Sequence, residues 1–434
     1  MRPARRAATR ISEGNTTLNN KILMVMPWRA YVRKATEEGF RVFSIWDPER
    51  IPDDHREEVA RYSEELLFTD FRDVAGLRRL VAGTAIRLGV AHVLHLGNED
   101  TQLPVCEEAH AHGLALNPPE ALRVINDKTA MRQLLRERGL SPVRATAAAS
   151  AHEVRSLLSR LELPVVAKPA LLSGSRGVRL VHEARDLDEW EEQLADQRYT
   201  GPVLIEEYLR GPEFSVETLT AQGTHHLVGI TSKRKTPPPG FTEIAHVHPA
   251  SLTEPDRAAV ADLVVRFLDE AGYRFGPAHT EVILTADGPR IVESQTRAPG
   301  DRIHRAIALA SGYDIEAAMF RALAGKPVQV NTAHRVGCVS FFQLPPGRLV
   351  SVEGLDDIRA LPFVHELKFP FAPGDTVPEI KNSGSRHGHV VIDAASEEEV
   401  DRRIALVRSL LRATTDAGLS DGSGDTPQAR AGLG

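Results

Sequence analysis

The chain has 434 residues, enough for roughly three domains, and its apolar fraction of 42% suffices for ordinary buried cores. A net charge of −6 offers no basic field to nucleic acid, and no apolar run reaches the roughly 18 residues of a membrane span. We therefore expect neither nucleic acid nor a membrane as a partner. The two cysteines, Cys106 and Cys338, lie far apart, which argues against a disulfide framework and fits a cytoplasmic protein.

The two ends of the chain differ in composition from the rest. Residues 1–20 are rich in arginine, with Glu13 as the single acidic residue, and are expected to form a disordered extension. A transit peptide is the alternative interpretation of the same residues. Residues 416–434 are rich in Gly, Ser and Asp and are expected to form a disordered tail.

A first domain is expected at residues 21–118, where short apolar runs alternate with helix-like segments. This alternation predicts parallel strands joined by helices. No G-x-G-x-x-G follows the first run, so the dinucleotide fingerprint is missing. We expect a Rossmann-like domain without a nucleotide of its own. Its strands are expected at Lys21–Pro27, Phe40–Asp47, Glu65–Thr69 and Val90–Leu96.

The next region, up to about residue 330, begins with a helix for which Asn126 or Asp127 is a suitable N-cap. Further on, a strand at Leu163–Pro169 is followed by a loop and another strand, whereas a Walker-type loop would open a helix. Further strands are expected at Val203–Tyr208, Glu213–Thr220 and His226–Thr231, and helices at Glu254–Ala271 and Asp301–Ser311.

Two strand-like runs, Glu281–Thr285 and Arg290–Ser294, flank an Asp-Gly turn and predict a β-hairpin. Glu281 and Glu293 should then lie on one face of adjacent strands, roughly 5 Å apart at Cβ. Two carboxylates that close repel by about 3 kcal/mol at an effective dielectric near 20, so a cation between them is expected. With the amide of Gln295 nearby, the oxygen ligands suit Mg²⁺. Solvated acids on an exposed hairpin are the alternative.

Several upstream segments could hold a phosphate. The loop at 171–177 (LLSGSRG) follows Lys168, and its glycines allow backbone N–H groups to point at phosphate oxygens. Its serines add hydroxyl donors, and Lys168 and Arg176 add charge. Lys128, at the start of a helix, is a second candidate phosphate lysine. An exposed turn beside solvated lysines is the alternative interpretation.

A strand that ends in Glu206-Glu207-Tyr208-Leu209 offers a flat adenine ring backbone donors and acceptors, and a carboxylate that can accept from its amino group. Glu213 follows a Gly-Pro turn and is placed to accept both ribose hydroxyls. A cluster of surface acids is the alternative. Arg297, two residues beyond Gln295, is a candidate clamp for a transferring phosphoryl group.

Residues 331–415 carry less chemistry and are expected to form a smaller α+β domain. Strands are predicted at Val336–Gln343, Arg348–Val352 and Val390–Asp393, and a helix at Glu397–Leu411.

The order of the segments is more informative than any one of them. NDKTAMRQLL, VVAKPALLSGSRGV, LIEEYLRGPEFSVE and HTEVILTADGPRIVESQTRAPGD together resemble the ordered motifs of the ATP-grasp superfamily, over about residues 21–330. The resemblance implies an α/β (α+β) protein with an ATP-grasp fold. A Rossmann-like domain would come first. The ATP-grasp domain would occupy 119–330, with a nucleotide lid subdomain at about 140–205, and a small C-terminal α+β domain would follow.

The resemblance also implies roles for individual residues. Glu281 and Glu293 would ligate Mg²⁺ or Mn²⁺. The family usually has Asn where this chain has Gln295, which keeps the amide oxygen but extends it by one methylene. The residues assigned to ATP are Lys128, Lys168, Ser173, Gly174, Ser175, Arg176, Gly177, Glu206, Glu207, Tyr208, Leu209 and Glu213.

SFFQLPPGRLVSVEGLDDI and SGSRHGHVVIDAASEEEV resemble the terminal domain of the L-amino acid ligases, the bacilysin-type dipeptide synthetases. Biotin carboxylases have a similar length, but their four-glycine phosphate loop and their Arg-rich bicarbonate motif are absent from this sequence. The resemblance implies that a carboxylate attacks the γ-phosphate of ATP. The resulting acyl phosphate then reacts with an amine, and Arg297 stabilises the tetrahedral oxyanion.

Candidate substrate residues follow from their place near this chemistry. Glu243 could hold an ammonium group and His246 could take the proton of the amine, with a structural histidine as the alternative. Backbone N–H groups around Gly300, before the helix, could receive a carboxylate. His279 is expected to be a packed or supporting histidine. The full set of candidates is Lys233, Glu243, His246, Gly300, Asp301 and Arg302.

Three functional hypotheses remain open at this point. The first is an ATP-dependent ligase that joins two small molecules, expected to be amino acids. The second is a ligase with another acid or acceptor, such as a carrier protein or an aminated sugar. The third is an ATP-binding protein without turnover. The resemblance is compatible with a homodimer, because the family is often dimeric.

Overall fold

The structure is a computed structural model that describes residues 19–95, 97, 99–172, 174–236 and 241–416. Most of the predicted N-terminal extension and all but the first residue of the predicted tail lie outside these residues. The first unit is a parallel sheet with strand order β3-β2-β1-β4, in which all four predicted strands occur. Its elements are β1 (Lys21–Val25), α1 (Arg29–Glu37), β2 (Arg41–Trp46), α2 (Asp53–Tyr62), β3 (Glu65–Phe68), α3 (Val74–Leu88), β4 (His92–His95) and α4 (Glu99–Ala111).

The central strand β1 shows why this sheet forms. Ile22 and Met24 belong to one hydrophobic core, whereas Leu23 and Val25 belong to another on the opposite face. A strand that is apolar on both faces is typical of a parallel sheet covered by helices on both sides.

Two helices, α5 (Pro119–Asn126) and α6 (Lys128–Glu137), lead into the second unit. The carboxylate of Asp127 accepts hydrogen bonds from the backbone N–H groups of Thr129 and Ala130, at 2.8 and 3.2 Å. Of the two predicted N-caps, Asp127 is therefore the one that caps α6, and Asn126 is the last residue of α5.

A four-stranded antiparallel sheet with strand order β5-β8-β6-β7 lies next in the chain. Trp190 is fully buried in its core and donates a hydrogen bond from Nε1 to the carbonyl of Gly177 at 2.7 Å. The elements are β5 (Ala145–Ala148), α7 (Ala151–Leu157), η1 (Leu158–Arg160), β6 (Val165–Pro169), β7 (Arg179–Val181), α8 (Asp186–Asp196) and β8 (Val203–Glu207). We call this unit the lid sheet.

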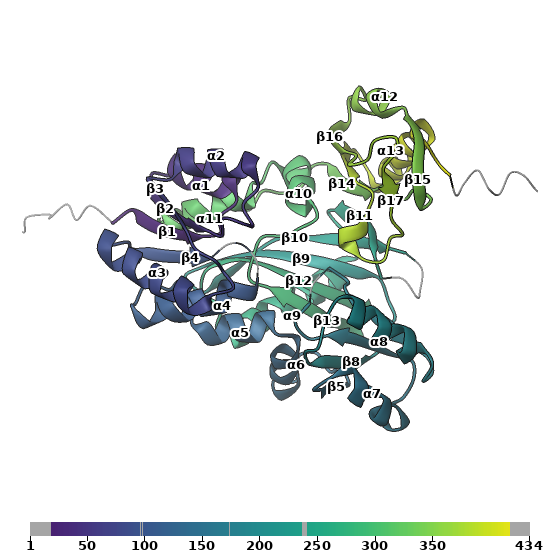
Figure 1. The fold of residues 1–434 in the computed structure, drawn as a ribbon, viewed down its shortest axis with the longest axis horizontal. Helices are drawn as coiled ribbons and strands as arrows, with labels where there is room; N and C mark the ends of the chain where they lie inside the picture. The colour runs from purple at the N-terminus through teal and green to yellow at the C-terminus, as the bar shows by residue number, and fades with distance from the viewer. Residues whose placement is uncertain (1–18, 96, 98, 173, 237–240, 417–434) are drawn as a thin grey trace, which may run out of the picture.

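An eight-stranded sheet with strand order β13-β12-β9-β10-β11-β14-β18-β16 forms the centre of the molecule. Helix α9 packs against β9, β10, β12 and β13, and Figure 1 shows these strands between the N-terminal sheet and the lid sheet. The elements of this first half are β9 (Glu213–Ala221), β10 (Thr224–Lys235), β11 (Glu243–His248), α9 (Glu254–Glu270), β12 (Gly276–Thr285) and β13 (Gly288–Gln295).

The predicted hairpin is confirmed and contains a bulge. Thr285 pairs with Gly288, and the register continues to Val282, which pairs with Ile291. The next pair is Glu281 with Glu293, so Val292 is an extra residue on β13. The bulge brings the two glutamates directly opposite each other.

The C-terminal part continues the central sheet, because β14 pairs with β11 and β18 pairs with β14. The sheet thus runs across residue 331, where a domain boundary is predicted. Strand β16 pairs with β18 at the edge of the same sheet, and the remaining strands of the C-terminal part form a small sheet, β17-β15-β19, at the upper right of Figure 1. The elements are α10 (Ile303–Ser311), α11 (Ile315–Leu323), β14 (Val336–Phe341), β15 (Gly347–Glu353), α12 (Leu355–Arg359), β16 (Val364–Lys368), β17 (Thr376–Val377), η2 (Ser383–Ser385), β18 (His389–Ala394), α13 (Glu397–Leu410) and β19 (Arg412–Thr415).

Strand β11 is not among the strands predicted from the sequence, because residues 231–250 are rich in proline and suggest a connection. In the structure β11 pairs with β10, and His246 lies opposite Lys233. No helix among the described residues is long and apolar enough to cross a membrane.

Candidate active site

A cavity of about 250 Å³ lies between the lid sheet and the central sheet. It brings together nearly all the predicted site residues, although they are spread over more than 170 positions of the chain. Ser173 lies outside the described residues, and Gly177 and Arg302 do not line the cavity. The predicted residues that line it are Lys128, Lys168, Gly174, Ser175, Arg176, Glu206, Glu207, Tyr208, Leu209, Glu213, Lys233, Glu243, His246, Glu281, Glu293, Gln295, Arg297, Gly300 and Asp301.

The two opposed glutamates each contact a lysine. Nζ of Lys233 bonds Oε1 of Glu281, and Nζ of Lys128 lies 3.0 Å from Oε2 of Glu293. Burial raises the pKa of Glu281, but the nearby charges of Lys233 and His279 outweigh burial and hold that pKa well below its ordinary value. Both lysines approach from outside the hairpin, from α6 and from β10.

The donor set at the hairpin fits a hard divalent cation. Glu281, Glu293 and Gln295 line the same cavity, and the amide oxygen Oε1 of Gln295 is buried without a hydrogen-bond partner among the described residues. The amide nitrogen of Gln295 donates to Glu293 at 2.8 Å, which orients the oxygen. The described residues contain no group of three or more His, Cys, Asp or Glu that could hold a metal ion. Two carboxylates and an amide oxygen suit Mg²⁺, which usually takes one or two carboxylates and completes its shell with water and substrate phosphates.

Opposite the hairpin, the lid sheet and α6 carry a buried basic cluster. Glu206 contacts both Lys168, at 2.5 Å, and Arg132, and Lys168 also donates to the bulge carbonyl of Val292 at 3.4 Å. Burial alone would raise the pKa of Glu206, but the two cations lower it to about 2. The pKa of Lys168 is lowered, first by burial and then by the like charges of Arg132 and Lys128. The carboxylate of Glu206 thus pairs with two buried cations, and an anion such as a phosphate would compensate the remaining positive charge.

The sequence predicts that a carboxylate at this strand end accepts from adenine, but the carboxylate of Glu206 is taken by Lys168 and Arg132. The carboxylate of Glu207 is bonded to Arg144, from the backbone N–H at 2.9 Å and from Nε at 3.0 Å. Tyr208 and Leu209 line the cavity with Glu207. Recognition of adenine at this strand end would therefore rest on backbone groups and side-chain surface.

A second cluster surrounds Lys233, whose side chain is 1% exposed. Its Nζ lies 3.0 Å from Glu213 and 3.3 Å from Glu243, in addition to its bond to Glu281. Burial would lower the pKa of Lys233, but the three carboxylates raise it well above its ordinary value. Glu213 also bonds Lys235. The structure thus places the carboxylate of Glu213, expected to face ribose, between two lysines of β10.

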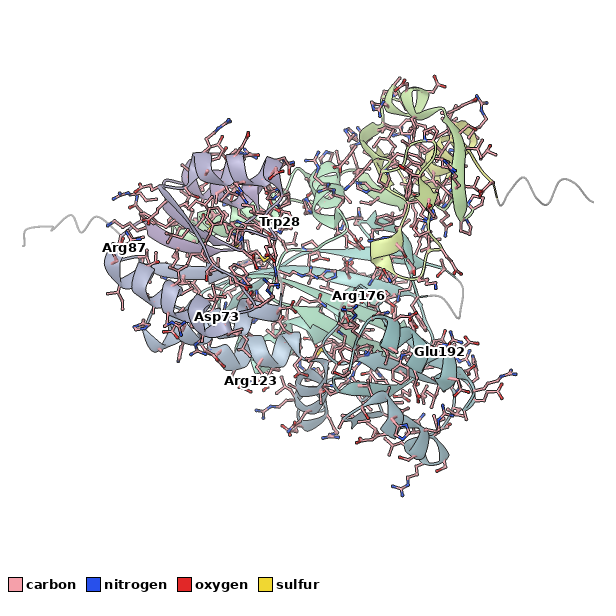
Figure 2. All side chains as sticks on the ribbon, viewed as in Figure 1. Trp28, Asp73, Arg87, Arg123, Arg176 and Glu192 are labelled. Atoms are coloured by element: carbon pink, nitrogen blue, oxygen red, sulfur yellow. The ribbon has the colours of Figure 1, made fainter. Side chains whose placement is uncertain are left out.

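The loop after Lys168 has the backbone that its composition predicts. Gly174 and Ser175 have positive φ values of 70° and 58°. The hydroxyl of Ser175 donates to the carbonyl of Phe241 at 3.3 Å, so the loop rests against the central part of the molecule. Figure 2 shows Arg176 near the middle of the molecule, where the lid meets the central strands, whereas Glu192 of α8 lies on the outer side. Gly177 serves the lid core, through its bond from Trp190.

Glu243, His246 and Asp301 form another part of the cavity lining. Nε2 of His246 lies 3.2 Å from Oδ2 of Asp301, while Nδ1 has no hydrogen-bond partner among the described residues. Arg302 points elsewhere and pairs with Glu366 at 2.9 Å, so the structure does not place its side chain at the predicted substrate site.

Several lining or supporting residues are missed by the sequence analysis. Arg132 follows Lys128 by one helical turn and Lys235 follows Lys233 by two strand positions, so periodicity could have found both. Ser383 and Arg386 come from the C-terminal part, and the segment that resembles the L-amino acid ligases contains both without indicating that they reach the cavity. His279 agrees with its predicted supporting role, because it bonds Glu217 at 2.8 Å and lies 3.5 Å from Glu281.

With this geometry established, comparison with known proteins gives two family matches. Residues 161–304 match an ATP-grasp domain, and residues 340–416 match the L-amino acid ligase C-terminal domain 2. The chain therefore contains an ATP-grasp domain, and the expected fold class is confirmed. The second match agrees with the resemblance of the C-terminal segments to the L-amino acid ligases.

Individual relatives agree with this classification. The chain is 30% identical to the uncharacterized protein y4rH of Sinorhizobium fredii, over 65% of this chain and 60% of that protein. It is 24% identical to the alanine–anticapsin ligase of Bacillus subtilis, over 45% of each chain. The chain thus spans about half of these relatives. The crystal structure of an L-amino acid ligase from Bacillus licheniformis has the same fold, with a TM-score of 0.77, 21% identity, and coverage of 92% of this chain and 99% of that one.

Proposed function

We propose that the protein is an ATP-dependent carboxylate–amine ligase that joins two amino acids through an acyl phosphate. The observation that carries this proposal is that the Glu281–Glu293 pair and the lysines Lys128 and Lys168 line one cavity. Paired acids beside two lysines fit a nucleotide whose phosphates bridge to a divalent cation.

In the first step a substrate carboxylate oxygen attacks the γ-phosphorus of ATP, and the bond from that phosphorus to the β–γ bridging oxygen breaks. ADP leaves, and an acyl phosphate remains. The chain contributes charge and position: Lys128 and Lys168 bind phosphate oxygens, and Arg297 faces the transferring group. A divalent cation held by Glu281 and Glu293, with Gln295, would neutralise phosphate charge when bound.

In the second step the amine nitrogen attacks the acyl carbon, and phosphate leaves with the bonding electron pair of the C–O bond. The attacking amine must lose a proton, and the imidazole of His246, which lines the cavity, is the acceptor that we propose. Arg297 stabilises the oxyanion of the tetrahedral intermediate. The lid sheet, seated through Ser175 on the central part, excludes water that would hydrolyse the acyl phosphate.

The C-terminal domain favours amino acids over bicarbonate, a carrier protein or an aminated sugar as substrates, because that domain matches the L-amino acid ligases. The test is a screen of all pairs of proteinogenic L-amino acids with ATP and Mg²⁺, followed by phosphate release and by mass spectrometry of the products. We expect phosphate release that depends on a particular pair, together with the mass of its dipeptide. ATP binding without amide formation from any pair would refute the proposal.

A further inference from the structure

A short segment of the C-terminal domain, Asn382–Arg386, forms part of the cavity wall. It contains the turn η2, which is fixed by a capping box: the Asn382 side chain accepts from Gly384, and the Ser385 hydroxyl accepts from the backbone N–H of Asn382. Ser383 lines the cavity beside residues that lie more than 80 positions earlier in the chain. A rigid turn that lines a cavity of another domain can position the residues around a bound substrate.

Ser383 connects the two sides of the cavity. Its hydroxyl donates to Oε2 of Glu243 on β11 at 2.8 Å, and its backbone N–H donates to the carbonyl of Gly174 in the phosphate loop at 3.2 Å. The other oxygen of Glu243 lies 3.3 Å from Lys233. The Glu243 carboxylate is therefore fixed at both oxygens, and one of the two partners comes from the C-terminal domain.

Arg386 fixes the second carboxylate at this end. Its guanidinium bonds both oxygens of Asp301, through Nη1 at 2.9 Å and through Nη2, and it stacks on Phe341 with Cζ 3.7 Å from the ring centroid. Asp301 is buried, which disfavours its charge, but hydrogen bonds from His246 and Arg386 outweigh burial and hold its pKa well below the ordinary value. Asp301 thus remains a carboxylate that accepts from Nε2–H of His246.

The orientation of His246 follows from this chain of contacts. When Nε2 carries the proton that bonds Asp301, Nδ1 of the neutral ring is an acceptor. The side chain of His246 is 1% exposed, lines the cavity and leaves Nδ1 without a partner among the described residues. A buried acceptor without a partner costs free energy.

We infer that Ser383 and Arg386 make the C-terminal domain one wall of the subsite for the amine substrate: they position Glu243 and His246, which receive the amino group of the incoming amino acid. This inference rests on the proposed function and deepens it. The chemistry favours an amine at this place, because the carboxylate of Glu243 and the imidazole of His246 line it together and suit an ammonium group that must lose a proton.

Hydroxylamine allows the two steps of the reaction to be measured separately. It is small enough to trap the acyl phosphate as a hydroxamate without a formed amine subsite, so hydroxamate yield reports the first step and dipeptide yield reports both steps. The probe is the pair of proteinogenic L-amino acids that the wild-type enzyme joins fastest. For Ser383→Ala we expect KM for the amine partner to rise about tenfold, the effect of about 1.4 kcal/mol. KM for ATP and the hydroxamate rate at saturating hydroxylamine should stay unchanged.

Arg386→Gln leaves the buried Asp301 without its main partner and risks misfolding, so the double variant Arg386→Gln/Asp301→Asn is measured beside it. We expect both to lose dipeptide formation with hydroxamate formation retained, and Arg386→Lys to recover part of the loss. Ser409→Ala and Arg402→Gln, on the exposed surface of α13, are matched controls in the same domain and should behave as wild type.

The outcomes distinguish a failure of the inference about the amine subsite from a failure of the proposed function. Loss of dipeptide with retained hydroxamate supports the inference. Parallel loss of both products, or no loss of either, in variants that melt as wild type does would overturn it while leaving the ligase assignment intact. A wild-type protein that forms neither hydroxamate nor dipeptide with any amino acid would refute the proposed function, and the inference would fall with it.

Discussion

Glu281 and Glu293 lie directly opposite each other on β12 and β13 because Val292 is an extra residue on β13. In a regular hairpin continued from the Val282–Ile291 pair, Glu281 would face Val292 instead. The bulge also presents the carbonyl of Val292 to Lys168 of the lid sheet at 3.4 Å. One backbone irregularity therefore sets the spacing of the two acids and the approach of the lid lysine.

Removal of one charge from this pair should abolish turnover with little effect on the fold. Glu293→Gln keeps the shape of the side chain, but it removes a carboxylate that faces Lys128 at 3.0 Å. We expect ADP release that depends on amino acids to fall by about 100-fold or more. Glu192→Gln, on the outer side of the lid (Figure 2), is the control and should keep full activity. Equal activity of the two variants would rule out a catalytic role for the hairpin acids.

Variants of Lys168 and Glu206 should change the stability of the protein and its affinity for ATP independently of each other. Lys168→Met removes one partner of a buried carboxylate. The loss of stability should be smaller than the roughly 3–5 kcal/mol of a wholly broken buried pair, because Arg132 still contacts Glu206. In Lys168→Met/Glu206→Gln we expect the free energy of unfolding to recover while KM for ATP stays at least tenfold raised. Chemical denaturation and initial rates measure the two quantities. Recovery of ATP affinity in the double variant would contradict a phosphate-binding role for Lys168.

His248 should make the stability of the protein depend on pH. It is the buried last residue of β11, its Nδ1 lies 3.1 Å from the hydroxyl of Thr231 on the neighbouring β10, and burial lowers its pKa from 6.5 to about 4. A histidine kept neutral in the fold stabilises the protein above pH 6.5, and that contribution is lost as the pH falls through about 4. The change is on the order of 3 kcal/mol at most.

The measurement is the free energy of unfolding between pH 8 and pH 4, for wild type and for His248→Gln. The wild-type curve should fall more steeply over this range than the curve of the variant. The exposed His152, replaced in the same way, is the matched control. Parallel curves for wild type and His248→Gln would show that His248 makes no such contribution.

Trp190 should affect nucleotide binding from outside the cavity. Its indole N–H bonds the carbonyl of Gly177, where the phosphate loop ends, at 2.7 Å. Trp190→Phe keeps most of the apolar surface but removes this bond, worth about 1 kcal/mol. We expect KM for ATP to rise about fivefold with a small decrease in melting temperature. Trp28→Phe, at a side chain that is 44% exposed, is the control. An unchanged KM for ATP would mean that the loop position does not depend on the lid core.

The sequence predicts those parts of the site in which residues close in sequence also lie close in space. The hairpin acids follow from an Asp-Gly turn, and Lys168 follows from a strand that ends in a loop of small residues. The bulge at Val292 could not be predicted, because a shift of one residue depends on what the strand pairs with on its other side. The partners of Glu206 and Glu213 could not be predicted either, since they depend on how the lid sheet and β10 are placed in space.

The part of the site contributed by the C-terminal domain could not be predicted, because the sequence of this domain suggests a separate unit with few candidate site residues. Its contribution depends on contacts such as Ser383–Glu243, between residues 140 positions apart. No pattern within either segment reports such a contact. Strand β11 was missed for a related reason: the prolines and glycine at 237–240 suggest a connection, and the alternation in Glu243–His248 is visible only beside β10.

The pairing of β11 with β14 has a consequence for how this protein and its relatives diversify. An exchange of the C-terminal domain between relatives would have to reproduce the register along β11, or an open strand edge would be left that invites aggregation. The same exchange would bring in a new Asn382–Arg386 segment and hence a new set of acceptors. The pairing of the central sheet and the choice of amine therefore depend on the same domain. A hybrid enzyme should change its preferred amine only when β14 pairs with β11 in the correct register.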